Sequence, residues 1–230
     1  MIWLDRVALF HPLDFAAVGI IFVLWAFVGW RVEHSAASKP SVSKIMAEYR
    51  REWMRQMITR EPRIFDAQTV AALRQGTSFF ASTSVIAIGG TLALIGNAEQ
   101  LAGVAEDLTF EMHPAIVWEI KLFVVAVFLT NAFLKFAWSN RLFGYCSVVM
   151  AAVPNDPNHQ DSAKMASKAA ELNITAARSF NRGLRSLYFA LASVAWLAGA
   201  VPLIIGAFIT LFVIWRREFA SQSREILLEK

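Results

Sequence analysis

Four long runs of apolar residues alternate with segments that carry most of the charge in this chain. An α-helix needs about 20 predominantly apolar residues to cross roughly 30 Å of hydrocarbon, and each of the four runs approaches or exceeds that length. The pattern therefore predicts four transmembrane helices, at residues 13–31, 77–96, 115–136 and 187–215.

The fourth run is longer than the others but too short for two full spans. We interpret it as one tilted helix over residues 187–215, with Pro202 and Gly206 as sites where the helix can kink. A short hairpin within this run is the main alternative.

The polar segments between the spans also have a helical pattern. In residues 41–60, apolar side chains recur at every fourth position among several Lys and Arg residues, which predicts an amphipathic basic helix. We expect this helix either to lie on a membrane surface rich in anionic lipids or to pack on the protein's own helices. Residues 137–186 predict an antiparallel pair of long helices, joined at the turn PNDPNH and projecting into the cytoplasm.

The composition agrees with a polytopic membrane protein. Hydrophobic residues make up 57% of the chain and aromatic residues 13%, and the mean hydropathy is +0.47. We therefore predict an all-α fold, formed by residues 1–230 as a single membrane domain. It has four transmembrane helices, long cytoplasmic helical extensions and an amphipathic interfacial helix. The single cysteine, Cys146, excludes an intrachain disulfide and a Cys-based zinc site, and it is expected to pack as a small apolar residue.

Lys and Arg residues are distributed unevenly among the loops. Residues 31–74 hold nine of them and residues 135–185 hold seven, whereas residues 97–114 hold none and carry four acidic residues. The positive-inside rule places the two basic loops in the cytoplasm, and we expect the membrane to be the bacterial inner (plasma) membrane. Four spans would then put both termini outside, which the four Lys and Arg residues after Trp215 oppose. An odd number of spans would remove the conflict, but no fifth apolar run is present.

Polar side chains inside the predicted spans form the candidate functional site. The second span has a column of small residues at seven-residue spacing with hydroxyl groups beside it, and the third span carries two lysines and an asparagine near one face. Ionisable groups in a membrane span are costly and usually mark a pathway or a partner. The residues of this candidate polar path are Thr83, Ser84, Thr91, Asn97, Lys121, Asn131 and Lys135. The alternative is that they form packing seams between helices.

Lys121 has its best candidate partner in Asp14, which begins the first span on the same outer side. We predict a membrane ion pair between these two residues, or an extension of Lys121 to the outer interface. Near the inner boundary, four arginines would attract anions at the mouth of a path or bind lipid head groups. They are Arg141, Arg178, Arg182 and Arg185.

Three phrases in the chain carry a resemblance to a known family. They are RQGTSFFASTSVIAIGG (74–90), KFAWSNRLFGYC with the following AAVP (135–154), and RSFNRGLRSLYFALASVAW (178–196). In this order they resemble the domain of unknown function 599 family of integral membrane proteins, from the first span through the fourth. The resemblance implies a multi-span membrane protein of a kind found in bacteria and plants, and it implies no catalytic residue.

The sequence has no nucleotide-binding loop, nucleophile elbow or HExxH signature. We therefore expect that the protein is not an enzyme and that it has no cofactor, resident metal or nucleic-acid partner. Two hypotheses remain. The first, slightly favoured, is a homo-oligomeric channel or transport-type protein whose second and third spans line a path for a small anion. The second is a non-conducting scaffold or accessory subunit that binds anionic lipid or a partner protein.

Overall fold

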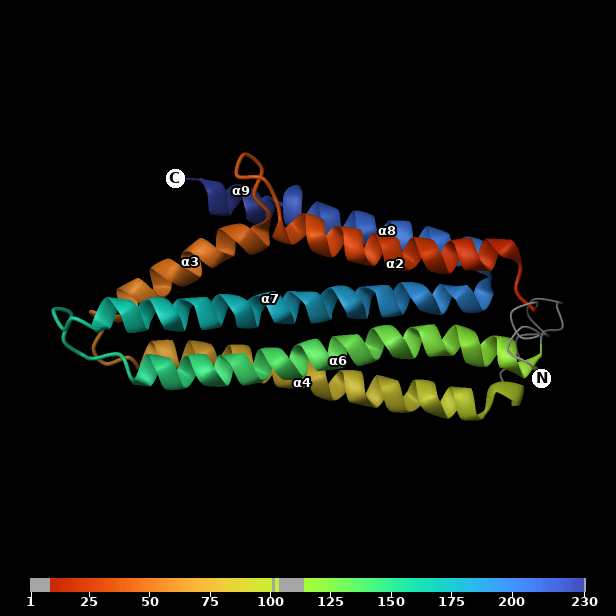
Figure 1. Ribbon diagram of the computed structural model, residues 1–230, viewed down its shortest axis with the longest axis horizontal. Helices are drawn as coiled ribbons and strands as arrows, with labels where there is room; N and C mark the ends of the chain where they lie inside the picture. The colour runs from red at the N-terminus through yellow and green to blue at the C-terminus, as the bar shows by residue number, and fades with distance from the viewer. Residues whose placement is uncertain (1–8, 101, 104–113, 230) are drawn as a thin grey trace. The chain divides into compact units, whose positions relative to one another are not determined.

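The computed structural model describes residues 9–100, 102–103 and 114–229, and all the regular structure in them is helical. The elements in chain order (Figure 1) are α2 (Pro12–Glu33), α3 (Val42–Met57), α4 (Ile64–Gly96), α6 (Ala115–Ala151), α7 (Ser162–Val194), η1 (Ala195–Ala198), α8 (Ala200–Phe219) and α9 (Gln222–Leu228). Four segments are long and apolar enough to cross a membrane: Pro12–Glu33, Ile64–Gly96, Ala115–Ala151 and Ala200–Leu228. The all-helical class is confirmed, as is the presence of four segments that could cross a membrane, but the fourth begins at Ala200 rather than at residue 187. Most of the predicted acidic loop 97–114 lies outside the described residues.

The first three predicted spans lie within helices that are longer than the apolar runs themselves. The run 13–31 fills most of α2, whereas 77–96 and 115–136 are only parts of α4 and α6. Both of these helices continue because their polar extensions still bury apolar side chains, such as Val70 on α4 and Phe143 on α6.

The contacts divide the chain into two compact units. The first unit consists of Met1–Trp30, Thr83–Ala132 and Leu184–Trp215, and the second of Arg31–Ser82, Phe133–Gly183 and Arg216–Lys230. Of the Lys and Arg residues that the structure describes, all but Lys121 and Arg185 belong to the second unit. The first unit therefore has the composition of a membrane-embedded helical bundle, and the second that of a basic extramembrane part.

A chain reversal interrupts the fourth predicted span. After α7 the short 3₁₀-helix η1 (Ala195–Ala198) is followed by Gly199, whose φ of 117° is a left-handed conformation that favours glycine. α8 then packs against α7, since a Cβ atom added at Gly206 would lie 3.4 Å from the carbonyl oxygen of Ala192. Residues 187–215 thus do not form the one continuous helix that we predicted. The hairpin alternative is what the structure contains.

In the second unit, α6 and α7 form an antiparallel pair. Ser139 Oγ on α6 donates a hydrogen bond to the carbonyl oxygen of Ala176 on α7 at 2.7 Å. Ser179 Oγ on α7 donates to the carbonyl oxygen of Lys135 on α6 at 2.9 Å. Both serines bond across the helix interface, so their hydroxyl groups fix the register of the pair. The predicted turn PNDPNH lies between the two helices.

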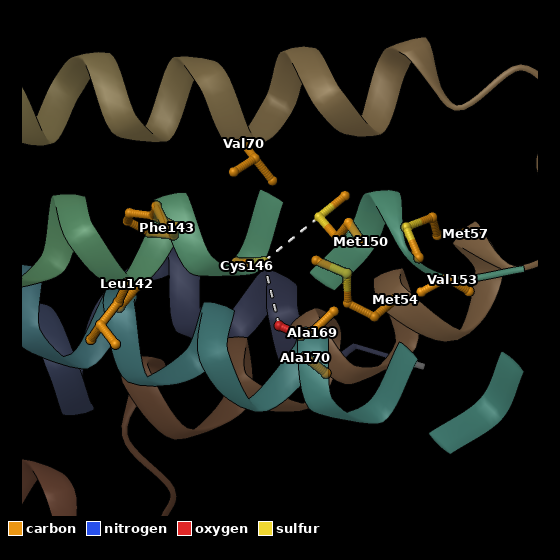
Figure 2. Close-up of a cluster of buried hydrophobic side chains, with 11 residues drawn as sticks. Met54, Met57, Val70, Leu142, Phe143, Cys146, Met150, Val153, Ala169 and Ala170 are labelled. Carbon is orange, nitrogen blue, oxygen red and sulfur yellow. Dashed lines mark hydrogen bonds between the residues drawn. The ribbon is translucent and has the colours of Figure 1, made fainter. Parts of the chain in front are cut away.

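α3 packs into the same unit through one face. Its N-cap residue Ser41 accepts a hydrogen bond from the backbone N–H of Lys44 at 3.3 Å. Its buried residues are Ile45, Met54 and Met57, and the two methionines join a core that includes residues of α4, α6 and α7 (Figure 2). Part of the predicted apolar face of this helix therefore packs on the protein itself. An interfacial location for the rest of α3 stays a prediction.

The C-terminal segment holds the beginning of α3 in place. The Glu218 carboxylate accepts hydrogen bonds from the backbone N–H of Ser43 at 3.0 Å and from its hydroxyl at 2.8 Å. Arg224 Nε donates to the carbonyl oxygen of Pro40 at 3.0 Å. A carboxylate at a helix N-terminus also interacts favourably with the helix dipole, so Glu218 stabilises the start of α3 in two ways.

Candidate functional site

Lys121 is buried in the first unit, with 6% of its surface exposed. Its Nζ atom lies 4.9 Å from the ring centroid of Trp118 and 6.0 Å from that of Trp196. An indole ring attracts a cation through its electron-rich face, and the attraction is stronger where water is excluded. Two aromatic rings therefore help to hold this ammonium group inside the helical bundle.

Asp14, the predicted partner of Lys121, belongs to the same cluster. Its Oδ1 atom accepts a hydrogen bond from Trp196 Nε1 at 2.7 Å, and its Oδ2 atom accepts one from the backbone N–H of His11 at 3.1 Å. Trp196 thus contacts both members of the predicted pair, one through its N–H group and the other through its ring. The ion pair itself stays a prediction. No pattern in the sequence marks Trp196, because its role depends on the chain reversal that follows it.

Asn131, another residue of the candidate path, bonds to Ser186, which no pattern in the sequence marks. Its Nδ2 atom donates to Ser186 Oγ at 2.6 Å, and Trp25 Nε1 donates to the same oxygen at 3.2 Å. Ser186 is fully buried, and the three residues come from α6, α7 and α2. One hydroxyl group therefore links three helices of the first unit.

Aromatic side chains fill the space beside this polar contact. Phe128, which follows Lys121 by seven residues on α6, is 1% exposed. Its ring centroid lies 4.9 Å from that of Phe22, 5.7 Å from that of Trp25 and 6.2 Å from that of Phe189. On the face of α6 that carries Lys121, packed aromatic rings therefore fill the space about two helical turns further along the helix. Contacts between aromatic rings stabilise a core by more than the free energy expected from the apolar area they bury.

The small polar residues of α4, together with Asn97 directly after its last residue, fall into two columns. Ser84 and Thr91 are buried, whereas Thr83 and Asn97 are exposed. Thr91 Oγ1 donates to the carbonyl oxygen of Ala87 at 2.8 Å, so this hydroxyl bonds back to its own helix. The predicted stripe of α4 thus does not form one wetted surface: one column is packed and the other faces outward.

The last residue of the path, Lys135, is half-buried in the second unit. The four arginines are not all in one environment either. Arg141 and Arg178 are exposed, but Arg185 is 6% exposed and belongs to the first unit. Arg182 Nε donates to a Glu33 carboxylate oxygen at 2.8 Å, and this hydrogen bond raises the pKa of Arg182.

Neither these residues nor any other described part of the chain places three His, Cys, Asp or Glu side chains together as metal ligands.

The phrases that resemble one family lie on α4, on the α6–α7 hairpin and on α7 with η1. A family model described as "Protein of unknown function, DUF599" matches residues 16–223. The chain belongs to the DUF599 family. Comparisons with curated proteins and with solved structures found no match. The DUF599 description names no activity, so the function must be inferred from the residues.

The Ser186→Ala variant is expected to lower the free energy of unfolding by about 1–3 kcal/mol, because it leaves two half-buried donors, on Asn131 and Trp25, without their acceptor. Thermal unfolding in detergent followed by circular dichroism measures the change. Ser193→Ala is the matched control, since Ser193 Oγ donates within α7, to the Ala190 carbonyl oxygen, and links no second helix. Equal losses from the two variants would contradict the linking role of Ser186.

Proposed function

We propose that this DUF599 protein is a non-conducting and non-enzymatic membrane scaffold or accessory subunit of the bacterial inner membrane. One observation supports this proposal above the others: polar residues of the candidate path bond to protein groups. Asn131 bonds to Ser186, Thr91 bonds to its own helix, and Lys121 lies against two indole rings. A conducting path needs polar groups that face water, whereas a packing seam needs polar groups that face other helices.

Liposomes that contain the purified protein are expected to show no flux of chloride, nitrate or potassium above that of empty liposomes. Lys121→Ala is expected to leave the flux unchanged and to reduce stability by about 0.5–2 kcal/mol, because the ammonium–indole contacts are lost. Fluorescent indicator assays measure the flux, and the thermal midpoint of the same sample shows that the protein is folded. Anion flux that Lys121→Ala abolishes or makes less selective would overturn the proposal.

The outward column of α4 favours a second candidate function. Thr83 and Asn97 are exposed, and a Cβ atom added at Gly90 would meet no atom within 4 Å. A path lined by this column would need several copies of the chain arranged around an axis. In that case Gly90→Leu blocks an anion flux that the unmodified protein conducts. Under the scaffold proposal there is no flux to block, and Gly90→Leu instead weakens a homo-oligomer, which light scattering detects.

The second unit has a surface suited to an anionic phospholipid. A groove of about 650 Å³ is lined by apolar residues of α3 and α9, including Ile45 and Leu228, and by the cations Lys44, Arg51 and Arg55. An apolar floor suits an acyl chain. Arg51 and Arg55 are paired with Glu48 and Glu52 of the same lining, so Lys44 is the cation that we expect to meet a phosphate group. We propose that this groove, which also contains acidic side chains, binds lipid at the membrane surface.

Lys44→Ala is expected to reduce the retention of phosphatidylglycerol by roughly fivefold, since one lysine near an anionic head group contributes about 1 kcal/mol. Native mass spectrometry of protein released from mixed micelles compares this lipid with phosphatidylcholine. Lys164→Ala is the matched control, because Lys164 is an exposed lysine that does not line the groove. Equal retention in both variants would exclude the groove as the lipid site.

A further inference from the structure

α6 exposes one row of large side chains along the part of the helix that belongs to the second unit. The row recurs at intervals of four and three residues and consists of Leu134, Trp138, Arg141, Tyr145 and Val148, which we call the α6 stripe. This spacing keeps side chains on one face of a helix, and it is the spacing by which one helix packs along another. Yet Leu134 is 57% exposed, Trp138 50%, Tyr145 42% and Val148 70%. The α6 stripe therefore has the pattern of a helix–helix contact but is uncovered in the described structure.

Lipid does not account for the far half of the stripe. α6 enters the second unit at Phe133, and with a rise of about 1.5 Å per residue Tyr145 and Val148 lie roughly 18 Å and roughly 22 Å further along the helix. A head-group layer is only about 5–8 Å thick on each side of the hydrocarbon core. Adjacent apolar side chains that stay exposed outside a bilayer are typical of protein-binding surfaces.

The residue types of the stripe are those that contribute most to protein interfaces. Trp, Tyr and Arg are enriched among interface residues whose loss costs most affinity, and here they stand in one row as Trp138, Arg141 and Tyr145. Arg141 Nε donates a hydrogen bond to Tyr145 Oη, and Arg141 Cζ lies 5.6 Å from the Tyr145 ring centroid. The tyrosine thus holds the guanidinium group along the stripe before any partner binds, which reduces the entropy lost on binding.

The α4 and α6 side of the second unit carries cations and almost no acid. Its one acidic residue, Asp66, is buried and paired with Arg60. Arg74 on α4 reaches α6 beside the stripe, where its Nε atom donates to Asn140 Oδ1 at 3.4 Å. Among the described residues, neither Arg74 nor Arg141 forms an ion pair. A partner that carries carboxylates would complement both of these exposed cations.

The other side of the second unit differs in this respect. Arg51 on α3 pairs with Glu171 of α7 at 2.8 Å, and Arg182 on α7 pairs with Glu33. The cations on that side are therefore neutralised within the chain, whereas those beside the α6 stripe are not. The unpaired charge and the exposed apolar row coincide on one surface.

We propose that the α6 stripe binds an amphipathic helix of a partner protein. Apolar side chains of that helix pack against Trp138, Tyr145 and Val148, and its Asp or Glu side chains bind Arg141 and Arg74. This inference rests on the proposed scaffold function, since it names the kind of partner that the scaffold holds. The liposome flux assay tests the scaffold function without involving the stripe, so the two proposals can fail separately.

The test uses the full-length protein in phosphatidylcholine nanodiscs and two fluorescent synthetic helical peptides. Both peptides carry leucine at the a and d positions of about three heptads, and they differ only in having Glu or Lys at the e and g positions. Fluorescence anisotropy, with empty nanodiscs as the baseline, should show the Glu peptide binding about tenfold more tightly than the Lys peptide. Arg141→Glu and Tyr145→Ala should each weaken the Glu peptide by about tenfold, and Arg141→Glu should strengthen binding of the Lys peptide.

Lys168→Glu is the matched control, because it makes the same change in net charge at an exposed position of α7 outside the stripe. Lys168 lies three residues before Glu171, which bonds to Arg51 on α3. This variant should weaken the Glu peptide by less than about twofold, since a screened distant charge contributes little. Equal losses from Arg141→Glu and Lys168→Glu, or equal binding of the two peptides, would overturn the proposal.

Photo-cross-linking in cells distinguishes the possible occupants of the stripe. p-Benzoylphenylalanine in place of Val148 should form an adduct with a second protein, located by mass spectrometry in an amphipathic segment with acidic residues beside its apolar face. Arg141→Glu in the same chain should remove this adduct. An adduct with a second copy of this chain, an adduct with phospholipid, or the absence of any adduct would each contradict the assignment of an acidic partner helix.

Discussion

Gly183→Ala is expected to destabilise the protein by about 1–3 kcal/mol, although alanine is the better helix former. A Cβ atom at this position of α7 would lie 2.7 Å from Cε1 and 3.0 Å from Cζ of Phe136 on α6. The Phe136 ring is fully buried, and its centroid is 5.4 Å from those of both Phe80 and Phe180. The ring cannot move away without disturbing its neighbours, so the two helices must separate.

Gly144→Ala on α6 is the matched control for this prediction. There the added Cβ atom would meet its nearest atom, Cζ of Arg74, at 3.9 Å, which is an ordinary contact. We expect this variant to be neutral or to stabilise the protein by up to about 1 kcal/mol through helix propensity. Phe136→Leu combined with Gly183→Ala should recover part of the lost stability. Thermal unfolding in detergent measures all three variants, and equal effects of the two alanine substitutions would contradict the close-approach argument.

The helices themselves could be predicted because their signal is local. Continuous apolar runs predicted α2 and the apolar parts of α4 and α6, and the spacing of Ile45 and Met57 predicted the buried face of α3. The turn between α6 and α7 was visible in PNDPNH for the same reason. Each of these features depends on residues within a few turns of one another.

The reversal between α7 and α8 could not be predicted with the same rules. Its residues, from Ala195 to Ala200, include no proline, asparagine or aspartate, so the apolar run appears unbroken. Only Gly199 marks the turn, and glycines are common in transmembrane helices. The length of the apolar run was a poor guide to the number of helices in it. The first unit also includes residues 184–186 of α7, which precede the apolar run.

The partners of the candidate site were beyond sequence reasoning for a different reason. Ser186 contacts Asn131 and Trp25, and Trp196 contacts Asp14, across more than fifty positions in the chain. No single-sequence pattern pairs such distant residues. For the same reason, spacing by sevens showed that α4 has a small-residue side, but not which of its two columns is packed and which faces outward.

The C-terminus is expected to lie on the same side of the membrane as the basic segment 31–74. Each of α2, α4, α6, α7 and α8 contributes a segment to the first unit. If this unit lies in the bilayer, the chain crosses it an odd number of times, and the two termini are on opposite sides. The four Lys and Arg residues after Trp215 then follow the positive-inside rule, and the conflict noted in the sequence disappears.

Reporter fusions test this topology directly. Green fluorescent protein fused after Lys230 should fluoresce in the cytoplasm, and alkaline phosphatase fused there should be inactive. A fusion made after Ala198, where α7 has crossed and α8 has not begun, should give the opposite pair of results. Active phosphatase after Lys230 would mean that residues 187–215 cross only once and in the outward direction. Between the two fusion sites lie α8 and the seven-residue α9, which is too short to span a bilayer, so a change of side can only come from α8.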